Sequence, residues 1–316
     1  MDGCKKQFCY AAEGMTCTLG HMRREYCAEW QGTGKVTDAV LPETAQTLLP
    51  WSGAAMGAAD LNFLTGVAKP TAVAIVGPES AGKTTILGAF YQLLYQGKLT
   101  TDQHCFSNSY TLTGWEAVAS NLRWKPDTPP TFPPHTPSTE ARAPGMLHLG
   151  FRRPGGTQHD YIFTDAPGEW FQKWAINESA LDAQGANWIA QHADVILLIA
   201  DRGALSGSRL GTARNDFQML AQRTLANARG RPIALVWTKG DIDVKPLMES
   251  KIRGMLASAV PAVTEFTVSV QWPEDDRAAN CFRQLFDWIV ATKRPRVVLP
   301  ATEEPGQDPL FRIGRR

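Results

Sequence analysis

Residues 77–84 have the types and spacing that bind the phosphate groups of a nucleotide. They fit the pattern G-x-x-x-x-G-K-[ST] at every fixed position, and we assign Thr85 to the same cradle: Gly77, Pro78, Glu79, Ser80, Ala81, Gly82, Lys83, Thr84 and Thr85. The glycines let the backbone curl so that successive N–H groups point at phosphate oxygens. Lys83 adds a positive charge near the β- and γ-phosphates, and the Thr84 hydroxyl is a hard ligand for Mg²⁺. The motif predicts a cradle for a nucleoside triphosphate and its metal ion.

A second motif, Asp165-Ala-Pro-Gly168, has the residues that sense a γ-phosphate. It follows a predicted strand at 161–164. A carboxylate in that place can hold Mg²⁺ through water, while the Gly168 N–H meets the γ-phosphate. These residues also suit an ordinary turn, but their place after a strand and downstream of the cradle favours the sensor. Because the position of such a loop depends on the γ-phosphate, the motif predicts a switch.

The carboxylate of Glu169 follows this motif directly. It can orient the hydrolytic water or take its proton, although it also adds repulsion near the γ-phosphate. A glutamate is equally suited to the first turn of a helix, where the helix dipole favours negative charge. We therefore keep both a catalytic and a structural role open for Glu169.

A threonine that closes over Mg²⁺ and the γ-phosphate is expected in the Pro-rich stretch 125–144. Long loops of this kind are usually functional or disordered. Thr136 and Thr139 both lie at a suitable distance before the next predicted strand, and we prefer Thr139.

The string Thr238-Lys239-Gly240-Asp241 can select the base, because it follows a predicted strand at 233–237. The Asp241 carboxylate can accept hydrogen bonds from N1–H and the exocyclic amino group of guanine, whereas adenine offers neither donor there. The Lys239 stem can lie over the base, and Thr238 can tie this loop to the phosphate cradle. Ser269 and Val270, at the end of a last predicted strand, can present a backbone N–H to guanine O6.

The elements around these motifs alternate between strands and helices. Short β-branched apolar runs predict buried strands, helical apolar spacing predicts helices, and Pro154-Gly-Gly-Thr157 predicts a hairpin turn. The strands are expected at 71–76, 146–152, 161–164, 195–200, 233–237 and 266–270, and the helices at 83–96, 212–228 and 278–292. We expect a three-layer α/β domain whose mostly parallel sheet carries one antiparallel edge strand.

The first 35 residues form a separate Cys- and His-rich module. Tetrahedral Zn²⁺ needs four ligands, and a segment this short cannot bury enough core without a metal. Four of five residues would bind it: Cys4, Cys9, Cys17, His21 and Cys27. Buried thiols without metal remain the alternative, and a structural clip is favoured over RNA reading. We expect a linker with a short helix over 36–70, the nucleotide-binding domain over 71–299 with an insertion at about 97–145, and a flexible tail over 300–316.

Charge and hydropathy exclude several classes of protein. The net charge of +1 argues against a generally basic nucleic-acid binder. No apolar run reaches the roughly 18 residues that a spanning helix needs, and no signal-peptide segment follows the N-terminal lysines. We expect a cytoplasmic protein that binds no membrane.

The order of these motifs over Gly77 to Gln271 resembles the Ras-like, TRAFAC-class P-loop GTPases. Met146-Leu-His-Leu149 and the run from Thr164 to Phe171 look more like the bacterial double-GTPase families, which are proposed to act in conflict- or defence-type systems. In two places the chain departs from the class. Glu169 stands where small GTPases carry glutamine, and Thr238 replaces the more usual asparagine. Only one set of motifs occurs, so any second GTPase is expected on a separate chain.

The resemblance implies a Mg²⁺-dependent enzyme that converts GTP to GDP and acts as a switch for a partner protein. That partner would be an effector or an activating protein, with a second GTPase among the candidates. No arginine finger is evident within the motifs, so a partner would be needed for speed. Two alternatives stay open. One is a P-loop ATPase or nucleotide kinase in which 238–241 is coincidental, and the other is a GTP-binding scaffold that does not hydrolyse.

Overall fold

The computed structural model describes residues 3–7, 11–13, 27, 29–31, 55–57, 60–66, 68–99, 104–123, 131–132, 145–153, 155–257, 263–272 and 275–292. The chain forms two compact units, residues 1–49 and 50–316. All of the predicted nucleotide-binding motifs lie in the second unit, so its sheet and helices position the candidate site.

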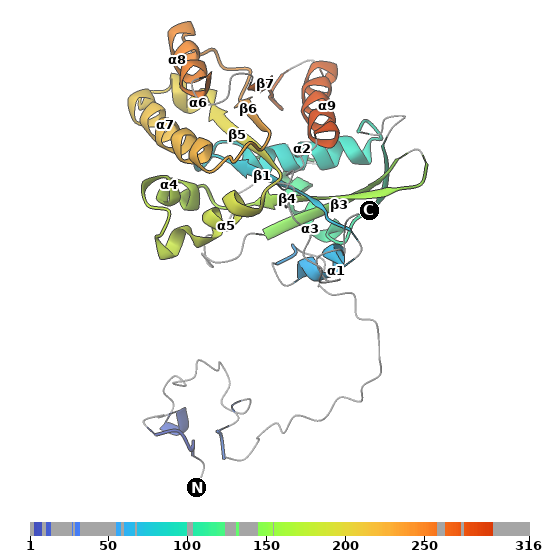
Figure 1. The fold of residues 1–316 in the computed structure, drawn as a ribbon, viewed down its shortest axis with the longest axis vertical. Helices are drawn as coiled ribbons and strands as arrows, with labels where there is room; N and C mark the ends of the chain where they lie inside the picture. The colour runs from blue at the N-terminus through green and yellow to red at the C-terminus, as the bar shows by residue number, and fades with distance from the viewer. Residues whose placement is uncertain are drawn as a thin grey trace, which may run out of the picture. The chain divides into compact units, whose positions relative to one another are not determined.

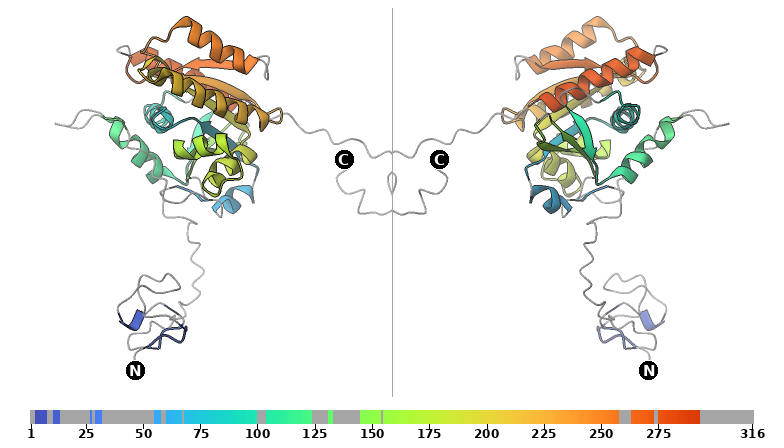
Figure 2. Two further views of the ribbon diagram at one scale, coloured as in Figure 1. Left: turned by 90° about the vertical axis from the view of Figure 1, so that its left-hand side faces the viewer. Right: turned by 90° about the vertical axis from the view of Figure 1, so that its right-hand side faces the viewer.

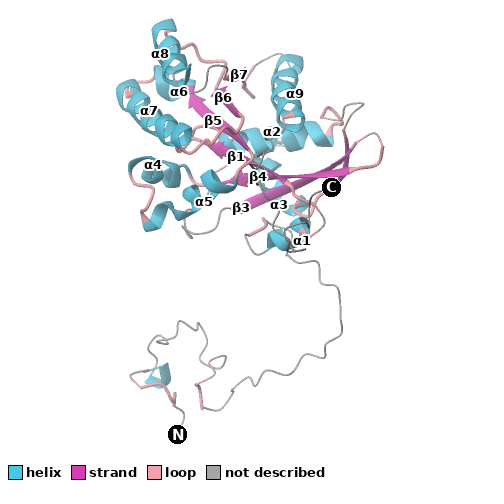
Figure 3. Cartoon of the chain, viewed as in Figure 1, coloured by secondary structure: helices cyan, strands magenta, loops and turns pink. Residues whose placement is uncertain are grey.

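A seven-stranded sheet with the order β2-β3-β4-β1-β5-β6-β7 forms the centre of this unit. The strands β4, β1, β5, β6 and β7 run parallel, while β3 is antiparallel to both of its neighbours, β2 and β4. Figure 3 shows the strands between the helices. Their bounds are β1 (Thr71–Val76), β2 (Cys105–Asn108), β3 (Gly145–Arg152), β4 (Gln158–Asp165), β5 (Val195–Asp201), β6 (Ile233–Thr238) and β7 (Thr264–Thr267).

Helices cover both faces of the sheet, as Figures 1 and 2 show. Side chains of α2 (Lys83–Tyr95), α3 (Leu112–Ala119) and α9 (Asp275–Ala291) pack on one face. Those of α4 (Gly168–Ile176), α5 (Gln184–His192), α7 (Leu210–Ala226) and α8 (Pro246–Ala257) pack on the other. The shorter helices are α1 (Leu61–Thr65), α6 (Arg202–Ser206) and the 3₁₀ turns Ala11–Glu13, Ser120–Leu122 and Leu181–Ala183. The predicted three-layer α/β architecture is present.

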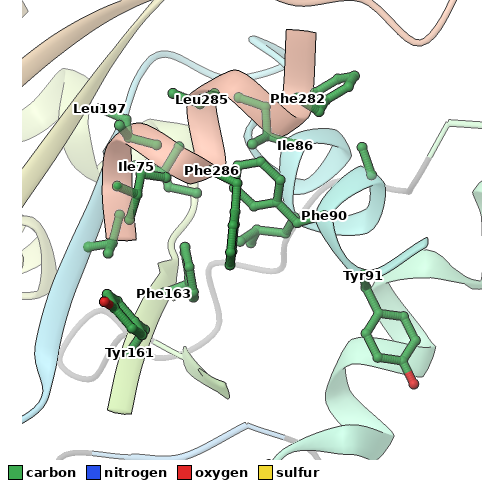
Figure 4. Close-up of a cluster of buried hydrophobic side chains, with 14 of the residues drawn as sticks. Ile75, Ile86, Phe90, Tyr91, Tyr161, Phe163, Leu197, Phe282, Leu285 and Phe286 are labelled. Carbon is green, nitrogen blue, oxygen red and sulfur yellow. The ribbon is translucent and has the colours of Figure 1, made fainter. Parts of the chain in front are cut away.

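Alternation along the buried strands divides the core into two layers. In β1, Val73 and Ile75 face α2 and α9, whereas Ala74 and Val76 face α4 and α5. An aromatic cluster fills the first layer (Figure 4), where the ring centroid of Phe90 lies 5.3 Å from that of Phe286 and 6.0 Å from that of Phe163. Such dense apolar packing holds the carboxyl ends of β1, β4, β5 and β6 in fixed relative positions.

Most of the predicted elements are confirmed with shifts of a few residues at their ends. The hairpin between β3 and β4 turns through Gly155 and Gly156, whose φ angles of +97° and +86° suit residues without a Cβ atom. The predicted helix at 212–228 begins at Leu210 and ends at Ala226. The short helix expected within the 36–70 linker is Leu61–Thr65.

Two predictions about the edges of the sheet were wrong. The antiparallel strand β3 is not at the edge, because β2 pairs outside it, and the half-exposed β2 lacks the apolar run that would have revealed it. The last strand, β7, covers Thr264–Thr267 rather than 266–270. Its partner β6 ends at Thr238, where Lys239 turns to a φ of +54°, so the residues after Val268 have no straight neighbour to pair with.

None of the helices in the described part of the chain is long and apolar enough to cross a membrane.

Candidate nucleotide-binding site

The turn between β1 and α2 has the curled backbone that a phosphate cradle needs. Gly82 has a φ of +85°, and Ser80 adopts the same left-handed region with a φ of +58°. Gly77 lies so close to β5 that a Cβ atom there would be 2.8 Å from Ile199 Cβ. The last residues of the motif begin α2, so the N-terminal end of that helix faces the turn.

Lys83 is buried in this turn, with 7% of its surface exposed. Its Nζ donates hydrogen bonds to the carbonyl oxygens of Pro78 at 2.7 Å and Gly77 at 3.1 Å. Burial lowers the pKa of the ammonium group to about 8, while the carboxylates of Asp165 and Glu79 act in the opposite direction. The lysine is therefore a buried cation held by backbone carbonyls at the mouth of the cradle.

The ends of β1 and β4 bring the metal-binding candidates together. These strands pair in parallel, so Asp165, the last residue of β4, lies beside the start of α2. The Thr84 hydroxyl donates to Asp165 Oδ1 at 3.2 Å. A hydroxyl and a carboxylate side by side are oxygen donors of the kind that Mg²⁺ prefers.

Gly168 is pressed against the phosphate-binding turn. A Cβ atom at this position would lie 2.1 Å from the Glu79 backbone nitrogen and 2.4 Å from the Pro78 carbonyl carbon, so only glycine fits. Helix α4 begins at Gly168, and Glu169 is in its first turn. A movement of the turn would therefore displace the start of α4.

The loop after β6 is joined to the phosphate-binding turn. The Thr238 hydroxyl donates to the Ala81 carbonyl oxygen at 2.8 Å, as expected from the sequence. Lys239 Nζ lies 2.7 Å from Asp201 Oδ2 at the end of β5. The Ser269 hydroxyl donates to Asp241 Oδ1 and accepts from the Gln271 N–H at 2.9 Å. The base-selecting candidates are thus held by side chains from three separate strand ends.

A cavity of about 580 Å³ connects the two loops. The predicted residues that line it are Glu79, Ser80, Ala81, Gly82, Lys83, Thr84, Thr85, Gly168, Glu169, Thr238, Lys239, Asp241, Ser269 and Val270. Three other predicted residues lie behind this lining, because the carbonyls of Gly77 and Pro78 hold Lys83 and Asp165 contacts Thr84. Thr136 and Thr139 lie outside the described residues.

Ala166 and Pro167, which lie within the predicted Asp165–Gly168 motif, and Gln271, which follows Val270, also line the cavity. Sequence reasoning missed five further lining residues, Ile86, Phe132, Ile242, Val268 and Phe282. Phe132 comes from the Pro-rich insertion, where no periodicity marks it. Asp201, which binds Lys239, could have been found, because it is a carboxylate that directly follows an apolar strand next to the base-selecting strand.

The string Met146-Leu-His-Leu149 contributes to packing rather than to the described lining of the cavity. His148 is fully buried in β3, and its Nδ1 accepts the Tyr110 N–H at 3.1 Å while Nε2 lies 3.1 Å from Asp160 Oδ1. Burial lowers the pKa of this histidine, and Asp160 opposes the shift. The imidazole ties the connection between β2 and α3 to the sheet.

Only two of the five zinc-ligand candidates, Cys4 and Cys27, are among the described residues, while Cys9, Cys17 and His21 lie outside them. Cys4 forms a β-bridge with Trp30, and the Trp30 N–H donates to the Cys27 carbonyl at 3.0 Å. In the described part of the chain no three Cys, His, Asp or Glu residues form a group that could hold a metal ion.

In the comparison with protein-family models, a model described as Double-GTPase 2 matches residues 71–289. This range runs from the start of β1 into α9 and includes every motif that lines the cavity. No curated protein matches the chain. The chain belongs to the Double-GTPase 2 family, and this membership implies that it binds and hydrolyses GTP.

Proposed function

We propose, from this membership, that the protein is a Mg²⁺-dependent GTPase whose nucleotide state switches a partner protein. The 2.8 Å bond from the Thr238 hydroxyl to the Ala81 carbonyl carries the proposal, because it joins the two loops that a guanine nucleotide must span. The cavity between them, about 580 Å³, is in the range of small-molecule sites. The resemblance to the double-GTPase families supports a role in a conflict- or defence-type system.

At the phosphate end, backbone N–H groups of 77–84 would hold the phosphate oxygens, and Lys83 would exchange its carbonyl partners for the β- and γ-phosphates. Thr84 and Asp165 fit Mg²⁺, since their oxygens lie 3.2 Å apart next to the cradle. Bound Mg²⁺ would neutralise charge on the phosphates. The same observations support Lys83 as the cation that stabilises charge during hydrolysis.

At the base end, Asp241 would accept two hydrogens from guanine. Its carboxylate lines the cavity together with Val270, whose N–H is proposed to meet O6. Lys239 would lie along the base. An adenine nucleotide would cover Asp241 without supplying the two donors, so it would bind more weakly.

The switch would operate through Gly168. Because Gly168 packs directly against the phosphate-binding turn, a γ-phosphate bound in that turn would displace the start of α4. We propose Thr139, in preference to Thr136, as the threonine that closes over the γ-phosphate. The moved α4 would then present a different surface to an effector, an activating protein or a second GTPase.

Glu169 is proposed to orient the hydrolytic water, since it lines the cavity one residue after Gly168. Among the described lining residues the positive charges are Lys83 and Lys239. Lys239 is paired with Asp201, which leaves Lys83 as the cation for the phosphates. A further cation supplied by a partner protein would therefore accelerate hydrolysis.

Single-turnover release of phosphate from GTP tests this proposal. We expect slow release that exceeds the buffer rate and requires Mg²⁺. Glu169→Ala, which removes the side chain that would orient the water or take its proton, should slow it about 100-fold with GTP affinity unchanged. Unchanged turnover in Glu169→Ala would show that the glutamate serves only as a residue of the first helical turn. Release equal to buffer with cognate partners present would leave a GTP-binding scaffold.

The Cys-rich module, residues 1–35, is proposed to hold structural Zn²⁺ through four of Cys4, Cys9, Cys17, His21 and Cys27. The backbone pairing of Gly3 and Lys5 with Gln31 and Glu29 supports this, because it closes the segment into a loop with candidate ligands near both ends. Elemental analysis of the purified chain should give one zinc per molecule, and its absence would end the zinc proposal. For the rest of the chain we propose the expected division into a linker over 36–70, a nucleotide-binding domain over 71–299 and a flexible tail over 300–316.

A further inference from the structure

We propose that Asp201 and Arg202 are positioning residues that set the guanine-selecting loop, Lys239–Ile242, in its working geometry. The inference rests on the proposed function and adds to it the residues that decide how well Asp241 can read the base. Neither residue lines the cavity, so their effect on the nucleotide must pass through the loop.

Both carboxylate oxygens of Asp201 are occupied by bonds within the chain. Oδ1 accepts the N–H groups of Gly203 at 2.9 Å and Ala204 at 3.2 Å, which caps α6. Oδ2 holds Lys239 Nζ at 2.7 Å. The carboxylate is 6% exposed and fixed to a helix start, so it gives the lysine one position.

This anchor acts on a strained residue. Lys239 has a φ of +54°, a backbone conformation that residues with a Cβ atom adopt only when neighbouring contacts hold them there. The absence of a side chain at Gly203 leaves room for the lysine stem, since a Cβ atom there would lie 3.0 Å from Lys239 Cδ. The ion pair and this packing together hold the first residue of the loop.

Arg202 holds the other end of the loop. Its Nε donates to the Ile242 carbonyl oxygen at 2.7 Å, and its guanidinium lies 2.8 Å from Glu249 Oε1 on α8. The same guanidinium lies 5.8 Å from the ring centroid of Trp237, the buried residue just before Thr238. With 13% exposure of the Arg202 side chain, these contacts are only weakly screened by water.

Glu249, the partner of Arg202 on α8, also belongs to a chain of charged groups that leads away from the loop. Glu249 also binds Arg253 at 3.1 Å, and Arg253 binds Glu265 on β7 at 2.9 Å. Arg253 lies 5.6 Å from the Trp237 ring centroid, and its ion pairs are with Glu249 and Glu265 rather than with residues 239–242. It therefore shares two neighbours of Arg202, Glu249 and Trp237, without the bond to the loop, which makes it the control.

Asp241 lies between the two anchored residues. Lys239 and Ile242 are held by Asp201 and Arg202, which are consecutive residues at the junction of β5 and α6. The direction of the Asp241 carboxylate therefore depends on this junction and on the bond from Ser269. Loss of Arg202 should therefore weaken recognition of the base and leave the phosphate cradle unchanged.

Binding measurements on the full chain separate these effects. Arg202→Ala should weaken GDP about tenfold and reduce the preference for GDP over IDP, which lacks the exocyclic amino group, about fivefold, as expected for one misplaced charged hydrogen bond. Affinity for inorganic tripolyphosphate should stay within about twofold. Arg253→Ala should leave all three values near those of the wild type. Equal losses for GDP and tripolyphosphate, or equal effects of the two variants, would overturn the proposal.

Hydrogen exchange of the nucleotide-free chain tests the positioning itself. The Gly240 and Ile242 amides donate to Val268 O at 3.0 Å and Lys239 O at 2.9 Å, so both should be protected. Arg202→Ala should speed exchange in a peptide covering 239–242 at least about fivefold, and Arg253→Ala should not. Unchanged exchange contradicts the positioning role. If Arg202→Ala speeds exchange as expected but the wild-type chain binds no guanine nucleotide, the proposed function is wrong and the positioning role stands.

Discussion

The two ends of the cavity that we propose binds the nucleotide are built in different ways. At the phosphate end, one contiguous segment, 77–84, supplies the turn, the lysine and the start of a helix, and Lys83 is held by carbonyls of that same segment. At the proposed guanine end, Ser269 bonds Asp241, while the consecutive residues Asp201 and Arg202, from another part of the chain, bond Lys239 and Ile242. Local backbone geometry thus sets the first end, and tertiary contacts set the second. Changes at the first should alter binding strength, and changes at the second should alter choice of base.

Removing the cation of the phosphate end should have the largest effect. Lys83→Ala should weaken GTP and GDP at least about 100-fold, because a charge-assisted bond to phosphate in a buried place is lost. The preference for GTP over ATP should persist, since Asp241 is untouched. Fluorescent-nucleotide titration measures both quantities. A base preference that disappears together with the affinity would show that the two ends are not separate.

Changing the carboxylate of the guanine end should reverse the choice of base. Asp241→Asn replaces an acceptor by an amide that can donate, and xanthine carries a carbonyl where guanine carries its amino group. We expect the ratio of XTP to GTP affinity to rise about 30-fold, with tripolyphosphate binding unchanged. Competition titrations provide the measurement. An unchanged ratio of XTP to GTP affinity would show that Asp241 does not contact the base.

Nucleotide binding should add a proton to the protein at the phosphate end, on Lys83. With a pKa lowered to about 8, Lys83 loses its proton above that pH, and phosphate should restore it. Nucleotide affinity should therefore fall by up to about tenfold per unit as pH rises above 8. The folding stability of the nucleotide-free chain should change with pH in the opposite direction. Between the folded Lys83 pKa of about 8 and its ordinary value of 10.5, the unfolded chain binds more protons than the folded chain, so the free energy of unfolding rises with pH over that range.

Calorimetric titration of GDP at about pH 8.5 in buffers of different ionisation enthalpy measures this uptake. Lys83→Arg, whose guanidinium stays charged, is the control and should show none. Uptake that persists in this variant would assign the proton to another group.

The smallest expected effect concerns packing at the guanine end. Gly203→Ala places a methyl group 3.0 Å from Lys239 Cδ, so the lysine stem must shift by a few tenths of an ångström. We expect GDP affinity to fall about threefold and tripolyphosphate affinity to stay constant. Gly211→Ala, where nothing lies within 4 Å of the added atom, is the matched control and should change neither.

The same contrast explains what could be predicted from the sequence. The cradle, the Asp165 to Gly168 motif and the buried strands were predictable because each depends on a short run of residues. The contacts of Arg202 with Ile242 and Glu249 were not, because they depend on the side-by-side pairing of β5 and β6 and on the position of α8. The half-exposed β2 and the cavity-lining Phe132 carry no periodic signal, so only the folded chain reveals them.

The central claim is that one cavity binds the phosphates of a nucleotide at 77–84 and its guanine at Asp241. Calorimetric titration of the full chain with GTP and with ATP, both with Mg²⁺, tests it most directly. We predict that GTP binds at least about 100-fold more tightly, because ATP leaves the Asp241 carboxylate unpaired. Equal affinity for ATP and GTP would contradict the account and favour an ATPase or a nucleotide kinase.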